Sequence, residues 1–448
     1  MTVSTPAGPH VDRASPADLM QLATDVGQAP MNIGAVLIVD PIPGFTVAEA
    51  GRLVAERIEA VPRLRQRLRR APPGCGPPYW ADDARYDLRQ HVRCRDCPEP
   101  RDQRALLDMA AALLTEPLPW SRPLWMATFI TGLANGSTGL VLVMNHVLAD
   151  GVGGLAVLAA LADEISGLAP AVRPAARFPV PAPRVRTLAA DAWSRRARQV
   201  THLASSLRSI RQGAAELGGA ARPRHVPRTS LNRPTGPRRR FDLVTADLAA
   251  IRDLGHARGG TVSDVVATAV AGAVHTLIAS RGEQLDLVTV SMPTSARQVT
   301  SAAQLGNQVG VMPVTLPAAG ELTTRVRQVA AITRERKHAA RGTSAVLLGP
   351  MFRLLAPTGL LRWLTDRQRL VHTFATYLHG PAEPISLAGA RVQAVIPLTS
   401  TAGNVTVSFV ALSYAGTLYI TVVSDPDRVP DVAVLTGALR RDLGDTAR

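Results

Sequence analysis

The chain has 448 residues, 46% of them hydrophobic and 19% charged, a composition typical of a folded globular protein rather than a disordered one. At this length roughly three-quarters of the unfolded surface can be buried, so two domains of ordinary size can form without disulfide or metal staples. Three cysteines exclude a disulfide-rich scaffold. The net charge of +15 suggests an anionic partner: a nucleic acid, a membrane surface or a phosphorylated substrate.

Signals for export or membrane insertion are not visible in the sequence. Residues 1–18 contain no apolar run of signal-peptide length, so we expect a cytoplasmic protein. The longest uncharged stretch, residues 399–424, is rich in Thr, Ser, Gly and Asn and alternates as strands do, which argues against a membrane-spanning helix there.

The first part of the chain mixes helix and strand signals. Ser15 is an expected N-cap, with Pro16 at the first helical position and Asp18 in the first turn, so we predict a helix to about residue 24. Asn135-Gly136 suits a turn between two strands. The remaining patterns predict a strand at 31–39, helices from 46 and at 103–114, strands at 124–130 and 139–144, and a helix at 152–165.

A proline-rich stretch, residues 170–183, ends this part of the chain. The expected division is an N-terminal subdomain (1–183), a basic crossover helix or linker (184–240) and a C-terminal subdomain (241–448). Several connections suit hairpins, so we expect an α/β (α+β) fold with mixed sheets. The patterns in the last part predict helices at 246–257, 263–278, 321–341, 344–364 and from 429, and strands at 285–291, 309–316, 392–396, 405–412 and 417–423.

Residues 146–151, HVLADG, lie between an apolar predicted strand and a predicted helix. His146 can act as a general base near neutral pH, and Asp150 follows four residues later, where a carboxylate can hold the local geometry. Gly151 would allow a tight turn and leave room for a substrate. The pattern is consistent with abstraction of a proton from a hydroxyl as that oxygen attacks a thioester.

Two other interpretations of this segment stay open. A structural histidine followed by an Asp-Gly turn gives the same pattern, because HxxxDG fixes only three positions. Gly151, Gly153 and Ala156 also match the GxGxxA fingerprint of dinucleotide-binding folds. A proline-rich stretch follows them, however, where that fold needs a strand ending in an acid.

Further motifs, in the same order along almost the whole chain, resemble those of the bacterial wax ester synthase/diacylglycerol acyltransferase family. Residues 15–18 resemble its SPLD element, and residues 145–151 occupy the place of its HHxxxDG motif. Pro123, Leu124 and Trp125 match its PLW motif. Residues 261–275 resemble its ND helix, and residues 305–310 resemble its LGNQ segment. Residues 413–416 and 425–431 resemble its closing signature.

The resemblance implies the chloramphenicol acetyltransferase and condensation-domain fold, with two subdomains and an active-site tunnel between them. It implies acyl transfer from acyl-CoA, as co-substrate, to a long-chain alcohol or diacylglycerol, without a metal or a permanently bound cofactor. His146 then corresponds to the base, and Asp150 to a structural carboxylate often paired with an arginine of the other subdomain. Arg297 is the candidate partner, with a surface cation as its alternative, and Asn307 is a candidate for the active-site wall or for a Gly-Asn turn.

The chain departs from the family pattern near the expected site. Asn145 replaces the first histidine of the motif but can still form hydrogen bonds. Tyr377 and His379 stand where the family has smaller residues, and both are candidates for lining the substrate site, as are the residues of the PLW motif. Trp125 also suits a core anchor. With these departures we still expect acyl transfer, but they put the family's usual lipid substrates in doubt.

Other functions remain alternatives. One is an acyltransferase of specialised metabolism with a non-lipid hydroxyl or amine acceptor, and another is a non-catalytic lipid- or CoA-binding protein. Nucleic-acid binding is suggested by charge alone, without a helix-turn-helix, RRM or zinc-finger pattern, so we expect no nucleic-acid partner. The sequence contains no GxSxG elbow, so a serine acyl-enzyme is unsupported. Cys94 and Cys97 lack the further ligands of a zinc site and indicate a loop at a strand end.

The positive charge is concentrated in the connection between the two halves. Residues 184–240 hold 14 arginines and two acids, which gives +12 of the total of +15. Apolar residues at a seven-residue spacing predict a stripe on a helix: Trp193, Val200 and Leu207, and Leu203, Ile210 and Leu217. This helix either packs on the core with its basic face in solvent or docks on anionic lipid, at the inner face of the membrane or on a lipid droplet.

Overall fold

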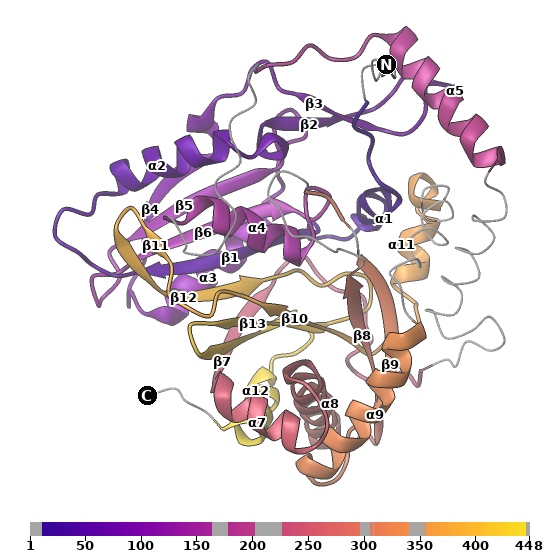
Figure 1. Cartoon of the computed structure of the whole chain (residues 1–448). Coiled ribbons are helices and arrows are strands. Elements are labelled where there is room, and N and C mark those ends of the chain that lie inside the picture. Colours follow the sequence, from indigo (N-terminus) through magenta and orange to yellow (C-terminus); the bar gives the residue numbers. More distant parts are fainter. Residues whose placement is uncertain are drawn as a thin grey trace, which may run out of the picture.

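The computed structural model describes residues 11–163, 178–201, 226–295, 305–307, 309–339, 352 and 355–444. Within these ranges two six-stranded sheets lie beside each other, and helices cover them (Figure 1). Both sheets contain parallel and antiparallel pairs. The expected α/β fold with mixed sheets in two subdomains is therefore confirmed.

The first sheet is built mainly from the N-terminal part of the chain. Helices α2 (Val47–Glu59), α3 (Gln103–Thr115) and α4 (Gly151–Leu161) pack on it. The predicted turn at Asn135-Gly136 is formed, with Gly136 at φ +77°. The strand order is β11 (Ser386–Leu387), β12 (Ala390–Leu398), β1 (Asn32–Val39), β6 (Thr138–Asn145), β5 (Trp125–Thr131) and β4 (Val92–Asp96).

The second sheet has helices α7 (Leu248–Ala257), α8 (Val262–Ser280), α9 (Leu322–Ala339) and α12 (Val432–Leu443) on one face. Within the described part of the chain, α8 alone is long and apolar enough to cross a membrane, but 72% of its apolar window is buried, so it is a core helix. The strand order is β7 (Arg240–Asp247), β14 (Thr417–Ser424), β13 (Val407–Tyr414), β10 (Thr373–His379), β8 (Leu287–Ser295) and β9 (Val309–Pro317).

Membership of the sheets does not follow the expected division of the chain at residue 241. β11 and β12 come from the C-terminal part, yet they extend the first sheet, where β12 pairs antiparallel with β1. Asp163, just after α4, holds the turn between them. Its carboxylate accepts hydrogen bonds from Arg57 Nη2 at 2.7 Å and from the backbone N–H of Gly389 at 2.9 Å.

Some strands carry no clear sequence signal and are absent from the predictions: β4, β7, β10, β11 and a small separate pair, β2 (Gln66–Arg69) with β3 (Tyr79–Asp82). β4 lies at the edge of its sheet and is mostly polar, and Cys94 lies within it rather than in a loop. The helix predicted over 344–364 falls partly outside the described residues. Among the described residues of this range, Phe352 and Leu355 are helical, and a 3₁₀ turn then precedes α11 (Leu360–Thr365).

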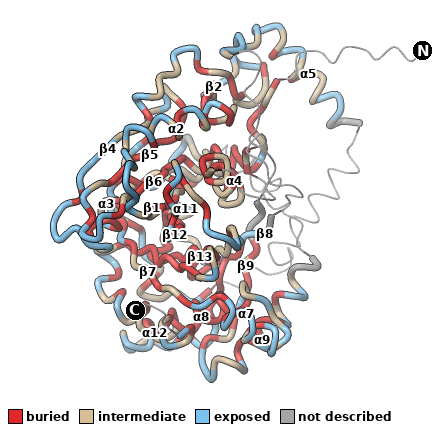
Figure 2. Tube along the Cα trace, turned by 60° about the vertical axis from the view of Figure 1, so that its left-hand side comes forward, coloured by how far each residue is buried: buried red, intermediate tan, exposed pale blue. Residues whose placement is uncertain are grey.

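Helix α5 (Val185–Thr201) begins the basic connection and packs on the first subdomain through an ion pair of buried Arg13 with half-buried Asp191. Arg13 Nε donates to Asp191 Oδ2 at 2.9 Å, and the same guanidinium bonds the carbonyl oxygen of Leu188 at 2.9 Å. Leu188 and Ala192 are buried, whereas Trp193 is 72% exposed. Figure 2 shows α5 as mostly exposed or intermediate. Trp193 therefore does not face the core, and the side chains of the other members of the predicted stripe, from Val200 on, lie outside the described residues.

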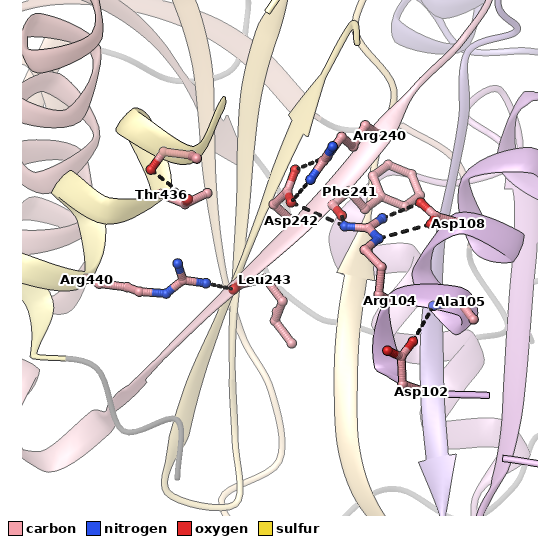
Figure 3. A network of polar contacts seen from close by, with 11 residues as sticks. Asp102, Arg104, Ala105, Asp108, Arg240, Phe241, Asp242, Leu243, Thr436 and Arg440 are labelled. Carbon is pink, nitrogen blue, oxygen red and sulfur yellow. Dashed lines mark hydrogen bonds and ion pairs between the residues drawn. The ribbon is translucent and has the colours of Figure 1, made fainter. Parts of the chain in front are cut away.

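A polar cluster joins the two subdomains at another point, between α3 and β7 (Figure 3). Arg104 Nη1 donates to the carbonyl oxygen of Phe241 at 2.6 Å and to Asp242 Oδ1 at 3.2 Å. Asp108, on the same helix, holds the other side of the guanidinium, with an Nη2–Oδ1 distance of 2.5 Å. The first sheet's helix layer is thus attached to the edge strand of the second sheet.

Candidate active site

His146 lies between the end of β6 and the start of α4, as expected. Its backbone N–H donates to the carbonyl oxygen of Met31 at 2.8 Å, which ties the turn to the start of β1. Asp150 is the N-cap of α4, where its buried carboxylate accepts from the backbone N–H of Gly153 at 2.8 Å. This carboxylate orients the helix start beside His146. Arg297 lies outside the described residues, so its pairing with Asp150 stays a prediction.

Asn307 reaches His146 from the other half of the chain. Its Oδ1 lies 3.1 Å from His146 Nδ1, and its Nδ2 donates to the carbonyl oxygen of His146 at 2.8 Å. Asn307 is 2% exposed and His146 is half-buried, so these bonds are partly shielded from solvent. The structure thus brings together two residues that are 161 positions apart and that the sequence motifs single out separately.

Asp18 is a further residue of this cluster that the motifs place only at the start of a helix. It lies in α1 (Pro16–Thr24), and its Oδ1 accepts from Asn307 Nδ2 at 2.9 Å and from the backbone N–H of Asn307 at 2.8 Å. The SPLD-like and LGNQ-like segments therefore meet at His146. No local sequence signal indicates this contact, because 289 positions separate the two residues.

An apolar cavity of about 90 Å³ has His146 on its wall and lies between the two sheets. Strands β10 and β13 supply one side, and β1, β6, β12 and α4 supply the other. Most of its lining is aliphatic: Ile33, Ala35, Leu142, Met144, Leu155, Leu158, Leu378, Pro397, Leu398, Val410 and Leu412, with Thr376, Thr399 and the glycines 34, 151 and 154. A cavity lined from both subdomains beside the histidine matches the position expected for the tunnel.

The residues of the PLW motif are not part of this cavity lining. Trp125 is 1% exposed, its indole N–H donates to the carbonyl oxygen of Leu64 at 2.7 Å, and its ring stacks on His91 at 4.5 Å. The carbonyl oxygen of Leu124 accepts from the backbone N–H of Asn145 at 2.9 Å. Pro123, Leu124 and Trp125 therefore support the end of β6 from behind, and the core-anchor interpretation of Trp125 is confirmed.

Tyr377 and His379 are also absent from the cavity lining. In β10 successive side chains alternate between the two faces of the sheet, and Thr376 and Leu378 are the ones that line the cavity. Tyr377 packs against the helix-side core and donates from Oη to Ser413 Oγ at 3.2 Å, and His379 is exposed. A period-two analysis of this strand would have chosen Thr376 and Leu378 instead.

Asn145 keeps the hydrogen-bonding role expected for it, and Gly151 lines the cavity but does not serve the expected tight turn. Asn145 Nδ2 donates to Asp25 Oδ2 at 3.1 Å, and its Oδ1 accepts from the backbone N–H of Val147 at 3.0 Å, so it holds the turn behind His146. Gly151 does not adopt a positive φ and is not needed for a tight turn. A Cβ there would lie 3.0 Å from Leu378 Cδ2, so the glycine lets α4 approach β10 closely.

Two mixed subdomains that meet at a histidine, with an apolar cavity beside it, have the arrangement of the acyltransferase and condensation-domain fold. A wax ester synthase/diacylglycerol acyltransferase from Marinobacter aquaeolei superposes with a TM-score of 0.66 at 21% identity, covering 96% of this chain and 98% of that one. The starter condensation domain of rhizomide synthetase, in complex with C8-CoA and Leu-SNAC, superposes with a TM-score of 0.63 at 15% identity over 97% and 92%.

The chain belongs to the wax ester synthase/diacylglycerol acyltransferase family. Residues 14–266 match its catalytic domain, and residues 305–445 match its C-terminal domain. A probable diacylglycerol O-acyltransferase of Mycobacterium tuberculosis is 29% identical over 425 residues, which cover 92% of this chain and 89% of that protein. The dinucleotide-binding interpretation of residues 151–156 is therefore wrong.

Proposed function

We propose that this acyltransferase moves an acyl group from acyl-CoA to the hydroxyl of a long-chain alcohol or a diacylglycerol, with His146 as the general base. His146 takes the hydroxyl proton while that oxygen bonds to the thioester carbonyl carbon. The C–S bond then breaks, and the imidazolium returns the proton to the CoA thiolate. A base placed in this way typically contributes ~10² to 10⁴ in rate.

The observation that carries the proposal is the position of His146 on the wall of an aliphatic cavity between the subdomains. Alkyl chains bind to such surfaces because burial removes apolar area from water. The cavity of about 90 Å³ is below the roughly 300 Å³ of ordinary ligand sites, so side chains such as Leu155 and Leu378 would move when a chain enters. The names of the relatives, and the C8-CoA in the condensation-domain complex, support the choice of acyl-CoA as donor.

The decisive experiment is a panel of acyl-CoA donors against long-chain alcohols, diacylglycerol and polar acceptors, with His146→Gln as the matched variant. We expect turnover with the lipid acceptors and a loss of ~10²-fold or more in His146→Gln. A folded His146→Gln protein with full activity would exclude the base. CoA or lipid binding without turnover on any acceptor would favour the non-catalytic alternative.

The second candidate function is acyl transfer to a polar acceptor of specialised metabolism. The structure weakens the sequence argument for it. It was suggested by Asn145, Tyr377 and His379, yet Asn145 bonds the backbone of the turn and the other two are not in the lining of the cavity. Turnover of polar acceptors alone in the same panel would favour it nevertheless.

For its location we propose a cytoplasmic protein that contacts the inner face of the membrane, or a lipid droplet, through the outward face of α5. That face exposes Trp193 at 72% and Val185 at 57%, and Arg186 and Arg196 are exposed beside them. Tryptophan favours the headgroup level of a bilayer, and each arginine near an anionic surface contributes ~1 kcal/mol.

Sedimentation with phosphatidylserine-containing vesicles tests this contact. The wild type should bind and release as salt is raised, and Trp193→Ser should bind at least several-fold more weakly. Trp120→Ser is a suitable control, because Trp120 is 46% exposed but lies far from α5 in the sequence and outside the basic connection. Equal binding of all three proteins, or binding that salt does not change, would exclude this surface.

A further inference from the structure

The hydrogen bonds of Asn307 determine how its side-chain amide is oriented. Its Nδ2 donates to Asp18 Oδ1 at 2.9 Å and to the carbonyl oxygen of His146 at 2.8 Å. A carboxylate and a carbonyl oxygen can only accept, so the NH₂ end of the amide must face them. The reverse orientation would place an amide oxygen against two acceptors and leave both without a donor.

This orientation decides which ring nitrogen of His146 carries the proton. Asn307 Oδ1 is left facing His146 Nδ1 at 3.1 Å, and an amide oxygen cannot donate. Nδ1 must therefore be the protonated nitrogen of the neutral imidazole. The lone pair then lies on Nε2, which is the nitrogen available to accept the proton of a hydroxyl.

Asp18 is itself held on both of its oxygens. Oδ1 also accepts from the backbone N–H of Asn307 at 2.8 Å, and Oδ2 accepts from the backbone N–H of Ser15 at 2.8 Å as part of the capping box of α1. Asp18 is 3% exposed and Asn307 is 2% exposed. If the carboxylate is removed, the side-chain N–H of Asn307 loses an acceptor. In a buried site such a hydrogen bond is strong, and few other groups can replace the acceptor.

We propose that Asp18 is a positioning residue for His146, which acts through Asn307 to hold the Nδ1–H tautomer and keep Nε2 as the base. The catalytic consequence rests on the proposed function, whereas the tautomer itself does not. The competing explanation is that Asp18 only caps α1 and attaches residues 305–307. Ser15 separates the two explanations, because its hydroxyl caps the same helix by accepting from the backbone N–H of Asp18 at 3.0 Å.

The first test reads the tautomer directly, without substrate. The full chain is labelled with ¹⁵N-histidine, long-range proton–nitrogen spectra are recorded, and His146→Gln identifies the signals among the ten histidines. The wild type and Ser15→Ala should show His146 with the proton on Nδ1, and Asp18→Leu should populate both tautomers. An Nε2–H tautomer in the wild type, or an unchanged tautomer in Asp18→Leu, would overturn the proposal. If Asp18→Leu does not fold, Asp18→Ala, which also removes the acceptor, takes its place with the same two outcomes.

The second test asks whether Asp18 acts through Asn307. We expect kcat to fall about 10- to 100-fold in Asp18→Leu with little change in KM, because only part of the contribution of the base is lost. The double variant Asp18→Leu/Asn307→Leu should lose no more than Asn307→Leu alone. Additive losses would show that Asp18 acts independently and would refute the positioning role. A fully active His146→Gln would instead refute the proposed reaction and leave the tautomer result intact.

Discussion

Leu378 is a residue at which the two subdomains approach each other closely beside His146. It lies on β10 and lines the cavity, and its Cδ2 is 3.0 Å from the place where a side chain on Gly151 would begin. The size of this one side chain therefore limits how much space a substrate finds next to the base. Closely packed interiors respond to changes of even one methylene, so the site should be sensitive to substitution here.

Shortening Leu378 should widen the range of acyl chains. In Leu378→Ala we expect the ratio of kcat/KM for longer over shorter acyl-CoA donors to rise about tenfold, since one methylene in an apolar pocket changes specificity by that order. Stability should fall by about 2 kcal/mol, because the side chain is only partly buried. Tyr377→Phe is the control, because Tyr377 packs on the opposite face. The same change of ratio in both variants would contradict this assignment of faces.

A sequence motif indicates which residues have a chemical role, but it does not show which residues lie next to one another in the fold. His146 and Asp150 are separated by four positions, so spacing alone indicates that they share one turn. Asn307 and Asp18 were also marked by motifs, but their contact depends on the tertiary fold. Tyr377 and His379 were assigned to the site by their size. The alternation of β10 excludes them, and β10 itself was not predicted.

Among the elements, β10 is joined to β8 by a buried histidine. The backbone N–H of His372 donates to the carbonyl oxygen of Thr289 at 2.8 Å, and the backbone N–H of Thr289 donates back to His372 Nδ1 at 2.9 Å. The ring Nε2 faces the carbonyl oxygen of Pro227 at 3.3 Å. Nδ1 must therefore be unprotonated, and Nε2 carries the proton. Burial lowers the pKa of His372, which favours the same neutral ring.

Because His372 is held neutral in the fold, we predict that the free energy of unfolding falls in mild acid. Below the ordinary histidine pKa of about 6.5 the unfolded chain takes up a proton that folded His372 does not, so the free energy of unfolding falls as pH falls. One such group gives a slope of at most about 1.4 kcal/mol per pH unit. Urea unfolding between pH 5 and 8 measures it. His372→Asn, whose Oδ1 can accept from Thr289, should have a shallower slope, and parallel slopes would exclude His372 as a source.

Helix α5 depends on Arg13, whose side chain is 1% exposed and bonds both Asp191 and backbone carbonyls. Arg13→Met should lower the free energy of unfolding by about 2 kcal/mol, because it breaks a partly buried pair and leaves those carbonyls without a donor. Thermal and urea unfolding would measure this. The exposed pair of Arg89 with Asp87 is the matched control, and Arg89→Met should change stability by less than about 1 kcal/mol. Equal losses would show that α5 is held by its apolar contacts.

Elements with a cap or a clear period could be predicted from the sequence, and those without could not. The cap at Ser15 marks the start of α1, whereas the cap of α8 is Thr261, two residues before the start predicted at 263. β4 and β7 offer no such signal, because β4 is a polar edge strand and β7 runs directly into the helix that was predicted to begin at 246. The ion pair that docks α5 spans 178 positions, so no local pattern contains it.

At the scale of the whole molecule, the subdomains share strands and cannot be separated by one cut in the chain. The chain leaves the second sheet after β10, adds β11 and β12 to the first sheet, and returns as β13. The order of the motifs was enough to predict two subdomains. It could not predict this crossing, because an apolar strand such as β12 has the same sequence pattern in either sheet. Arg104 adds a polar link between α3 and β7.

Because β12 completes the first sheet, the two subdomains should unfold together. We expect the protein to unfold in a single calorimetric transition, with equal calorimetric and van't Hoff enthalpies. Asp163→Ala tests the coupling, because it removes the acceptor for Arg57 and for the backbone of the β11–β12 turn. The variant should lower the transition temperature and broaden or split the transition as the hairpin loosens. Asp87→Ala, which removes the partner of the exposed Arg89 and the cap of a three-residue 3₁₀ turn, should keep one sharp transition. Two well-separated transitions in the unmodified chain would mean that the subdomains fold independently despite the shared strand.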